Sequence, residues 1–387
     1  MGRFLFVVPP LAGHTFPTVA VGQELAWRGH TVAWAGDPRY LDPLLPTGTA
    51  LIPVGTGIHH ERGVQPHRPH GLRGAAALKF LWEDYLIPLA HAMIPETEAA
   101  AEEFRPDVMI VDQQALAGAL VARQRGLPWA TSATTSAELT DQFATMPRLG
   151  EWVRQRIVEF QLDCGVSHPV DLRFSDDLLL AFTSEALVGP ATVFPGHYVF
   201  VGPSIGARAN SGSFPWNWLD PARRHVLISL GTVNPAAGQR FFTTTVEAVE
   251  PLAERLQAIL VAPPGLLGAV PDHVLVRDFV PQLDLLPRVD VVVSHAGHNT
   301  VCETLAHGLP LVVAPIRDDQ PVIASQVTNA GAGTRVHFGR VNPSELRGAI
   351  LTVLDDPSYR SAARRIQASF TTAGGAPAAA DHLEKLL

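Results

Sequence analysis

Two stretches of the chain, "DVMIVDQQALAGALVARQRGLP" (107–128) and "DVVVSHAGHNTVCETLAHGLP" (290–310), follow one plan. Each starts with an aspartate, continues with a short aliphatic run and reaches a polar side chain five positions later, at Asp112 and His295. Each then passes into a helical pattern that ends at Gly-Leu-Pro. Such a succession is typical of a strand–helix unit in a parallel sheet. The repeat therefore predicts an α/β protein with two similar halves.

The two halves also open alike, with "RFLFVVPPLAGH" (3–14) and "HVLISLGT" (225–232), each a strand pattern that ends in a polar loop. Ligands bind outside the carboxyl ends of the strands in an open parallel sheet. We therefore expect a cleft between two facing domains, with two polar groups of each domain beside the ligands. These groups are His14, Asp112, Thr232 and His295.

The chain changes in texture at "ARANSGSFPWNWLDPARR" (207–224), which has few aliphatic residues and is predicted to be a linker. It separates a first domain, 1–206, from a second domain, 225–357. A helical segment, 358–387, completes the chain.

Composition excludes several classes of function. The 387 residues are 47% apolar and carry a formal net charge of −8 with scattered basic residues, which disfavours nucleic acid and anionic membranes as partners. No apolar run approaches the roughly 18 residues of a membrane span, so we expect a cytoplasmic protein without stable membrane insertion. The histidines of the segment 53–74 lack a carboxylate or cysteine framework, which disfavours a metal site. They are His59, His60, His67 and His70.

The motif "HAGHNT" (295–300) opens a helix after an aliphatic strand. The first helical turn has unpaired N–H groups and a partial positive charge, and Gly297 lets a ligand approach the backbone. The motif therefore predicts a phosphate-type anion site, to which Gly231 and Thr232 add donors. An ordinary helix cap is the alternative. Neither G-x-G-x-x-G after the first strand nor the P-loop motif is present, which disfavours a nicotinamide dehydrogenase and a P-loop kinase.

Three further positions are candidates for contacts to a nucleotide and a sugar. Phe279 in "RDFVPQ" can form a wall for a base or belong to the core. Glu303 can accept hydrogen bonds from a ribose or lie on a solvated helix face. Asp319 and Gln320 follow the strand predicted at 311–314 and can bind sugar hydroxyls.

Together, "GH" after the first strand, "SLGT", "FVPQ", "HAGHNT…E", "GLP" and "DDQ" resemble the signature of family 1 glycosyltransferases with the GT-B fold. The resemblance covers nearly the whole chain and is greatest to bacterial enzymes that glycosylate small natural products. It implies two facing Rossmann-like domains with an interdomain cleft. The domain 1–206 would bind the acceptor, the domain 225–357 would bind the donor, and 358–387 would cross back to the N-terminal domain.

The resemblance also implies roles for single residues. Phe279 would stack on the base, the backbone of Val280 would read the base edge, and Gln282 would lie near the ribose. Glu303 would bind the ribose. Plant members carry tryptophan at the position of Phe279, so the base is not determined by this motif. The remaining donor-binding residues implied are Gly13, Gly231, Thr232, His295, Gly297, His298, Asn299, Thr300, Asp319 and Gln320.

In this family His14 matches the general base and Asp112 its orienting partner. An imidazole suits deprotonation of a hydroxyl at neutral pH, and attack opposite the diphosphate would invert the anomeric carbon. Without the second-domain signature, the favoured interpretation would be that His14 is a capped loop residue and Asp112 a helix N-cap. The family needs no metal or other cofactor. The substrate would be a UDP-sugar or a dTDP-sugar.

An acceptor pocket is expected in the N-terminal domain, for a small apolar acceptor. Two rivals remain: a non-catalytic protein that binds a nucleotide sugar or small molecule, and a sugar-nucleotide epimerase of the same fold. The epimerase would need further acid–base carboxylates near the sugar. A homodimer is left open. The candidate acceptor residues are Phe80, Trp82, Tyr85, Phe143 and Met146.

Overall fold

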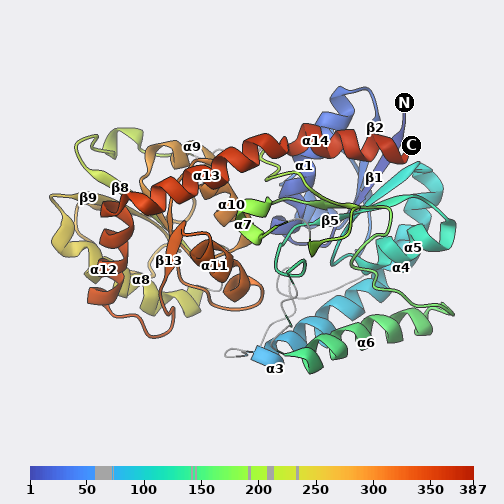
Figure 1. Ribbon diagram of the computed structural model, residues 1–387, viewed down its shortest axis with the longest axis horizontal. Helices are drawn as coiled ribbons and strands as arrows, with labels where there is room; N and C mark the ends of the chain where they lie inside the picture. Colours follow the sequence, from blue (N-terminus) through green and yellow to red (C-terminus); the bar gives the residue numbers. More distant parts are fainter. Residues whose placement is uncertain are drawn as a thin grey trace. The chain divides into compact units, whose positions relative to one another are not determined.

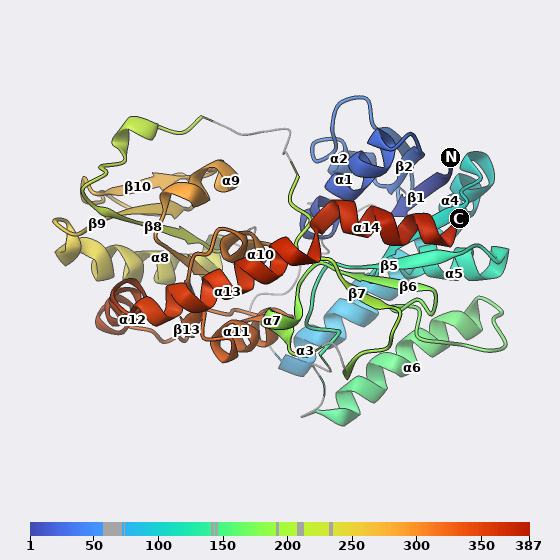
Figure 2. The ribbon, with the colours of Figure 1, turned by 45° about the horizontal axis from the view of Figure 1, so that its top comes forward.

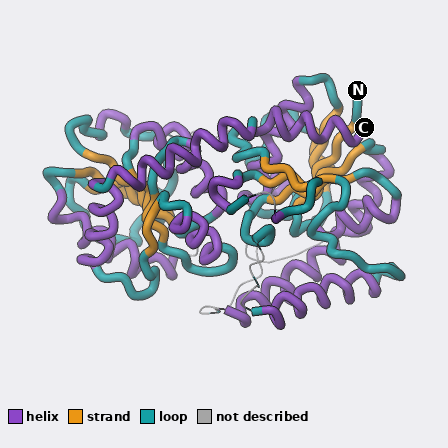
Figure 3. Tube along the Cα trace, in the orientation of Figure 1, coloured by secondary structure: helices purple, strands orange, loops and turns teal. Residues whose placement is uncertain are grey.

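The computed structural model describes residues 1–56, 72, 74–140, 143, 146–190, 193–206, 213–231 and 235–387. The chain forms two compact units. Unit 1 contains Met1–Ser184, Pro190–Ala209 and Ala373–Leu387, and unit 2 contains Glu185–Gly189 and Asn210–Thr372. Each unit has one parallel sheet among helices (Figure 3), so the predicted pair of Rossmann-like α/β domains is confirmed.

Unit 1 is built on a seven-stranded parallel sheet with the order β3-β2-β1-β4-β5-β6-β7. The order reverses between β1 and β4, so the carboxyl ends of these two strands border a topological switch point, the place where open α/β sheets bind ligands. The strands are β1 (Arg3–Val7), β2 (Thr31–Gly36), β3 (Ala50–Pro53), β4 (Val108–Asp112), β5 (Trp129–Ala133), β6 (Leu178–Ala181) and β7 (Tyr198–Phe200).

Helices cover both faces of this sheet because alternate residues of its buried strands point to opposite sides. Leu5 and Val7 of β1 pack with η1, α4, α5 and α6, whereas Phe4 and Phe6 pack with α1, α2 and α14. The helices of unit 1 are α1 (Ala12–Trp27), α2 (Pro38–Leu41), α3 (Gly74–Lys79), the π-helical η1 (Phe80–Leu86), α4 (Ile87–Phe104), α5 (Leu116–Arg125), α6 (Pro147–Asp163), α14 (Gly375–Leu383) and η6 (Glu384–Leu386).

Unit 2 repeats this plan with six parallel strands in the order β10-β9-β8-β11-β12-β13. Its switch point lies between β8 and β11, which pair from Val226 to Ser229 with Val291 to Ser294. The strands are β8 (Arg224–Ser229), β9 (Leu256–Val261), β10 (Val274–Arg277), β11 (Val291–Ser294), β12 (Leu311–Val313) and β13 (Gly333–Arg335).

The sheet of unit 2 is also covered on both faces. Figure 2 shows α8 and α12 on one side and α9 on the other. The helices are α7 (Glu185–Val188), η3 (Trp216–Trp218), α8 (Pro235–Val249), η4 (Glu250–Leu252), α9 (Gln282–Leu285), η5 (Leu286–Arg288), α10 (His298–Ala306), α11 (Gln320–Asn329), α12 (Pro343–Asp355) and α13 (Pro357–Ala373).

The end of the chain belongs to unit 1. Helix α14 lies along α1 (Figure 1), and its fully buried Leu383 joins the cluster of Phe4 and Phe6. Arg28 of α1 bonds the carboxylates of Asp381 at 2.6 Å and Glu384 at 2.8 Å. Apolar burial and ion pairs therefore hold the C-terminal residues on the N-terminal sheet.

The structure divides the chain at other residues than the sequence suggested. The described part of the expected linker 207–224 packs on unit 2, because Phe214 is buried there beside Trp216. The return to unit 1 occurs at 373 rather than 358, because α13 buries Ile366 in unit 2. Glu185–Gly189 of the expected domain 1–206 also belongs to unit 2.

Across the described residues, no helix is both long enough and apolar enough to span a bilayer. The same residues contain no group of three or more histidine, cysteine, aspartate or glutamate side chains arranged to hold a metal ion. His59, His60, His67 and His70 lie outside the described residues.

Candidate active site

His14 lies in the first turn of α1, directly after β1. The sequence predicted a polar loop at this point, after the first strand. The helix instead begins at Ala12 and includes Pro17. A proline this close to a helix start removes only one main-chain hydrogen bond, so the helix tolerates it. The early start fixes His14 on a rigid element at the switch point of unit 1.

Asp112, the last residue of β4, holds the ring of His14. Both carboxylate oxygens lie 2.9 Å from Nδ1 of His14, and the carboxylate is fully buried while the imidazole is 17% exposed. Oδ1 of Asp112 also accepts from the backbone N–H of Gln114 at 2.8 Å. An ionised carboxylate can only accept hydrogen bonds. Nδ1 of His14 therefore carries the proton, and it donates this proton to Asp112.

Thr134, just after β5, completes this cluster. Its hydroxyl donates to Oδ2 of Asp112 at 2.8 Å, and its oxygen lies 2.8 Å from Nδ1 of His14. Three neighbouring parallel strands, β1, β4 and β5, thus bring one side chain each to the same edge. We call His14, Asp112 and Thr134 the histidine cluster.

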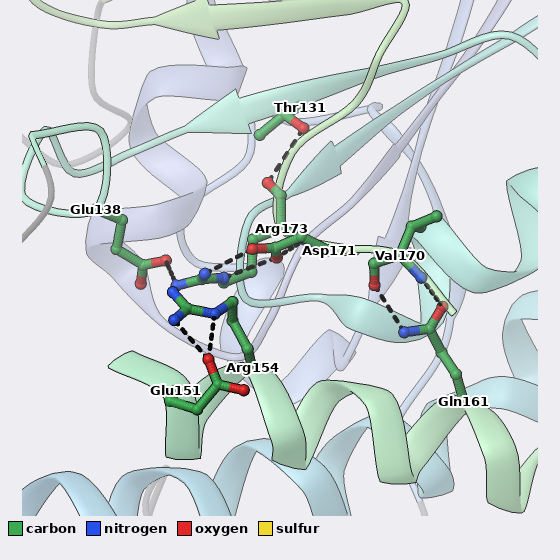
Figure 4. Close-up of polar contacts among 8 residues, drawn as sticks. All are labelled: Thr131, Glu138, Glu151, Arg154, Gln161, Val170, Asp171 and Arg173. Carbon is green, nitrogen blue, oxygen red and sulfur yellow. Dashed lines mark hydrogen bonds and ion pairs between the residues drawn. The ribbon is translucent and has the colours of Figure 1, made fainter. Parts of the chain in front are cut away.

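A buried ion-pair network anchors the segment that follows Thr134. Figure 4 shows Arg173 between Glu138 and Asp171, with distances of 3.2 Å and 2.6 Å to their carboxylates. The backbone carbonyl of Arg173 accepts from Thr131 of β5. Burial raises the pKa of Glu138, which the Arg173 guanidinium opposes. The network therefore ties the 134–138 segment to β5.

In unit 2, His295 directly follows β11 and lies between two glycines. A Cβ at Gly231 would be 2.7 Å from Cε1 of the ring, and a Cβ at Gly297 would be 2.5 Å from Nε2. Both distances are too short for any larger side chain. Only glycine on both sides leaves room for the imidazole, which explains why these residues stand together at the end of β8 and the start of α10.

The surroundings of His295 favour its neutral form. Burial lowers its pKa to about 4, the positive charge of Arg317 acts in the same direction, and the Ser229 backbone opposes them only partly. Its Nδ1 has no hydrogen-bond partner among the described residues. Ala296 beside it has a φ of 67°, which is unfavourable for a residue with a Cβ. A half-buried cationic neighbour and an unpaired ring nitrogen suit an incoming anion.

The predicted base and ribose contacts differ from one another in burial. Phe279 is 52% exposed, so it is no part of the core. Val280 is buried. Glu303 is buried on α10, and Oε2 accepts from the Nε2 of Gln282, the first residue of α9, at 2.6 Å. The structure therefore brings Gln282 and Glu303 together.

The side chain of Gln320, the first residue of α11, accepts hydrogen bonds from the protein backbone. Its Oε1 accepts from the backbone N–H groups of Ile316 and Arg317 at 2.9 Å and 3.0 Å. These two bonds shape the loop that holds Asp318 at a φ of 55° and ends at Asp319.

His298 is buried and lies 3.5 Å from the sulfur of Cys302. Gly297 is the N-cap of α10, whose first turn contains Asn299 and Thr300. Thr232 lies outside the described residues.

Comparison with known proteins decides the family. Residues 254–386 match the family described as erythromycin biosynthesis protein CIII-like, C-terminal domain. An uncharacterized UDP-glucosyltransferase, YojK of Bacillus subtilis (strain 168), is 30% identical over 99% of this chain and 97% of its own length. The chain belongs to the family 1 glycosyltransferases.

Other relatives agree with this assignment. Demethyllactenocin mycarosyltransferase of Streptomyces fradiae is 29% identical over 100% of this chain and 87% of its own. The crystal structure of the glycotransferase of kitacinnamycin has a TM-score of 0.79 and 28% identity, and the match covers 100% of this chain and 99% of that one. The GT-B fold predicted from the sequence is thereby confirmed.

The acceptor residues predicted for this glycosyltransferase are dispersed. Trp82 and Tyr85 are buried in η1, within the cluster that covers one face of the sheet of unit 1. Phe143 packs against that cluster from outside it. Phe80 is half-buried at the start of η1, and Met146 is 50% exposed before α6.

Sequence reasoning missed two polar residues of this glycosyltransferase. Thr134 had a signal, since it follows the strand next to β4, but threonine is common in strands and gave no reason to single it out. Arg317 belongs to the motif "RDDQP", in which only Asp319 and Gln320 were interpreted as candidate contacts to a sugar. Its charge reaches His295 only because β12 lies beside β11 in the sheet.

Proposed function

We propose that this glycosyltransferase moves a sugar from a UDP-sugar or dTDP-sugar to a hydroxyl of a small apolar natural product, with inversion and without a metal ion. The observation that carries the proposal is the histidine cluster, with Asp112 and Thr134 both at Nδ1 of His14. The names of the relatives support it: one is a UDP-glucosyltransferase and another a mycarosyltransferase.

In this mechanism Nε2 of His14 takes the proton of the acceptor hydroxyl. The hydroxyl oxygen forms a bond to the anomeric carbon, and the bond from that carbon to the phosphate oxygen breaks with its electron pair going to the diphosphate. Asp112 stabilises the imidazolium formed at His14, as the aspartate of a catalytic triad does. Attack from the side opposite the leaving group inverts the anomeric carbon.

The donor would be held by unit 2. The N-terminus of α10, the His295 ring and the Arg317 cation would stabilise the negative charge that develops on the diphosphate. The exposed face of Phe279 is available for stacking on the base, and Glu303 would accept from the ribose hydroxyls while Gln282 fixes its position. Asp319 and Gln320 would contact the sugar.

The test compares the parent with His14→Ala. With UDP-glucose or dTDP-glucose and a phenolic acceptor, the variant should lose at least about 1,000-fold in kcat, since it lacks the general base. Its affinity for UDP should be nearly unchanged, because all the proposed donor residues except Gly13 belong to unit 2. His91→Ala, at an exposed histidine of α4, is the matched control and should keep parental turnover. Near-parental turnover of His14→Ala would contradict the proposed base.

A further inference from the structure

The side chain and the backbone of Gln320 together hold Arg317. Oε1 of Gln320 accepts from the backbone N–H of Arg317 at 3.0 Å and from that of Ile316 at 2.9 Å. The backbone N–H of Gln320 donates to the carbonyl of Arg317 at 3.1 Å. One residue therefore binds both backbone polar groups of Arg317, and the course of the main chain at Arg317 depends on the Gln320 side chain.

The amide of Gln320 has only one orientation that satisfies these bonds. Two N–H donors face the same end of the side chain, so the oxygen lies at that end and the Nε2 group at the other. An amide oxygen has two lone pairs, and both are used within the protein. Because Gln320 is 7% exposed, water has little access to these bonds. A substitution without an acceptor leaves the N–H groups of Ile316 and Arg317 unpaired, which the loop can relieve only by changing its conformation.

This loop, residues 315–319, starts beside His295. The N–H of Ala314, just before the loop, donates to the carbonyl of Ser294 at 2.8 Å, and Ser294 is the residue before His295. The positive charge of Arg317 lowers the pKa of His295, in agreement with this arrangement. The side chain of Arg317 is 27% exposed, so an anion can reach it.

The loop conformation also restrains the guanidinium of Arg317. Asp318 has a φ of 55°, which a residue with a Cβ rarely adopts and which persists only where the surrounding structure imposes it. Its carboxylate lies 3.5 Å from Nε of Arg317. A guanidinium has five N–H donors in a planar fork, so it can contact a carboxylate through Nε and bind a phosphate through its other nitrogens. The conformation that Gln320 holds is therefore also the one that fixes this guanidinium.

We propose that Gln320 is a positioning residue for Arg317: its amide oxygen holds the 315–319 loop so that the Arg317 guanidinium binds the diphosphate of the donor. The inference rests on the proposed function and adds a role that requires no sugar. If Gln320 acted only by contacting a sugar hydroxyl, a nucleoside diphosphate without a sugar would bind equally well without it. UDP and dTDP are therefore the informative ligands.

The first test measures, by calorimetric titration, the affinity for whichever of UDP and dTDP the parent binds more tightly. Gln320→Met has no acceptor and should lower this affinity about 10-fold, the equivalent of one lost charge-assisted hydrogen bond. Gln320→Glu keeps both acceptors and should bind more tightly than Gln320→Met, although it adds a negative charge. Repulsion of the diphosphate alone predicts the opposite order. An affinity of Gln320→Met within about twofold of the parent, or weaker binding by Gln320→Glu than by Gln320→Met, refutes the proposal.

A double-mutant cycle shows whether the effect passes through Arg317. Arg317→Met removes the guanidinium and should lower the affinity by about 10-fold or more. Because Gln320 acts through Arg317, adding Gln320→Met to Arg317→Met should lower the affinity by less than about twofold further. Losses that multiply, to about 100-fold, would show that Gln320 acts on the nucleotide independently of Arg317 and would refute the positioning role.

Gln257→Met is the matched control for a general loss of stability. Gln257 is also a buried glutamine of unit 2, and its Oε1 accepts from the backbone N–H of Asp220 at 2.6 Å. It lies at the amino end of β9, whereas His295 and the 315–319 loop follow the carboxyl ends of their strands. Gln257→Met should lower the Tm and keep the parental affinity. An equal loss of affinity in Gln257→Met and Gln320→Met would attribute both losses to folding and contradict the positioning role.

The outcomes separate this role of Gln320 from the proposed function. A parent that binds neither UDP nor dTDP would refute the donor site itself, and the positioning role with it. A parent that binds one of them and transfers its sugar, together with a parental nucleotide affinity in Gln320→Met, would leave the proposed function in place and refute only the role of Gln320.

Discussion

His295 should make unit 2 less stable as the pH falls below 7 in the nucleotide-free protein. Burial lowers the pKa of this ring to about 4, whereas a histidine of the unfolded chain titrates near 6.5. Between these values the unfolded chain binds more protons than the folded chain, so stability present at pH 7 is lost as the pH falls through this window. The loss between pH 7 and pH 5 is about 2 kcal/mol.

Urea unfolding of unit 2 at pH 5 and pH 7 measures this loss. In His295→Asn no ring titrates at this position. The change in unfolding free energy between pH 7 and pH 5 should therefore be about 2 kcal/mol smaller than in the parent. The matched control is His273→Asn, at another buried histidine of unit 2, whose Nε2 lies 3.1 Å from the Val249 carbonyl. This variant retains His295, so it should also retain the contribution of His295 to the pH dependence of the unfolding free energy. Equal pH dependence in the parent and His295→Asn would refute the reasoning.

Bound nucleotide should reduce this loss of stability at low pH. The negative charge of a diphosphate beside the ring favours the imidazolium, so saturating UDP raises the pKa of His295 and weakens the acid-induced loss. UDP at 100 times its Kd adds about 2.7 kcal/mol by mass action alone. The informative quantity is therefore the difference between the parent and His295→Asn. If UDP stabilises both by the same amount at pH 5 and at pH 7, the phosphate does not lie beside His295.

Three further outcomes are expected. Thr134→Val should lower kcat about 10-fold and leave UDP affinity unchanged, because the His14 ring loses one of its two orienting partners; unchanged kcat would assign Thr134 to folding alone. Glu303→Gln should reduce the preference for UDP over dTDP about 10-fold in competition binding, since a charged acceptor of the ribose 2′-hydroxyl is lost; a constant ratio would remove Glu303 from the ribose site. Leu383→Ala should destabilise unit 1 by about 2–5 kcal/mol in urea, whereas Leu387→Ala, at an exposed side chain, should change it by less than about 0.5 kcal/mol; equal effects would contradict the role of α14.

The sequence predicted the sheets better than the helix starts. Strand β12 was expected at 311–314 and lies at Leu311–Val313, because a short aliphatic run between turn residues has few alternatives. The start of α1 was missed, since Pro9, Pro10 and Gly13 indicate a loop that continues to His14. Which side chains meet across strands depends on register and order, so Thr134 could not be paired with His14 in advance.

The sequence also could not predict how deeply individual side chains are buried. A lone glutamate on a helix is more often solvated, yet Glu303 is 5% exposed and paired with Gln282. For Phe279 the sequence left the core and an exposed wall for a base equally open, and the side chain is half exposed. Both positions lie in unit 2, among those proposed to contact the donor. Functional sites are among the places where local expectation is expected to fail.

The two histidines at the two switch points have opposite electrostatic surroundings. Each follows or nearly follows a strand at the reversal of its sheet, His14 in unit 1 and His295 in unit 2. Asp112 faces His14 at 2.9 Å, so a proton gained at Nε2 is compensated within the protein. His295 has no carboxylate partner among the described residues and lies near the Arg317 cation, so a proton there is compensated only by an anion from outside. The first environment suits a base that must hold a proton during transfer, and the second suits a ring that becomes charged when a diphosphate arrives.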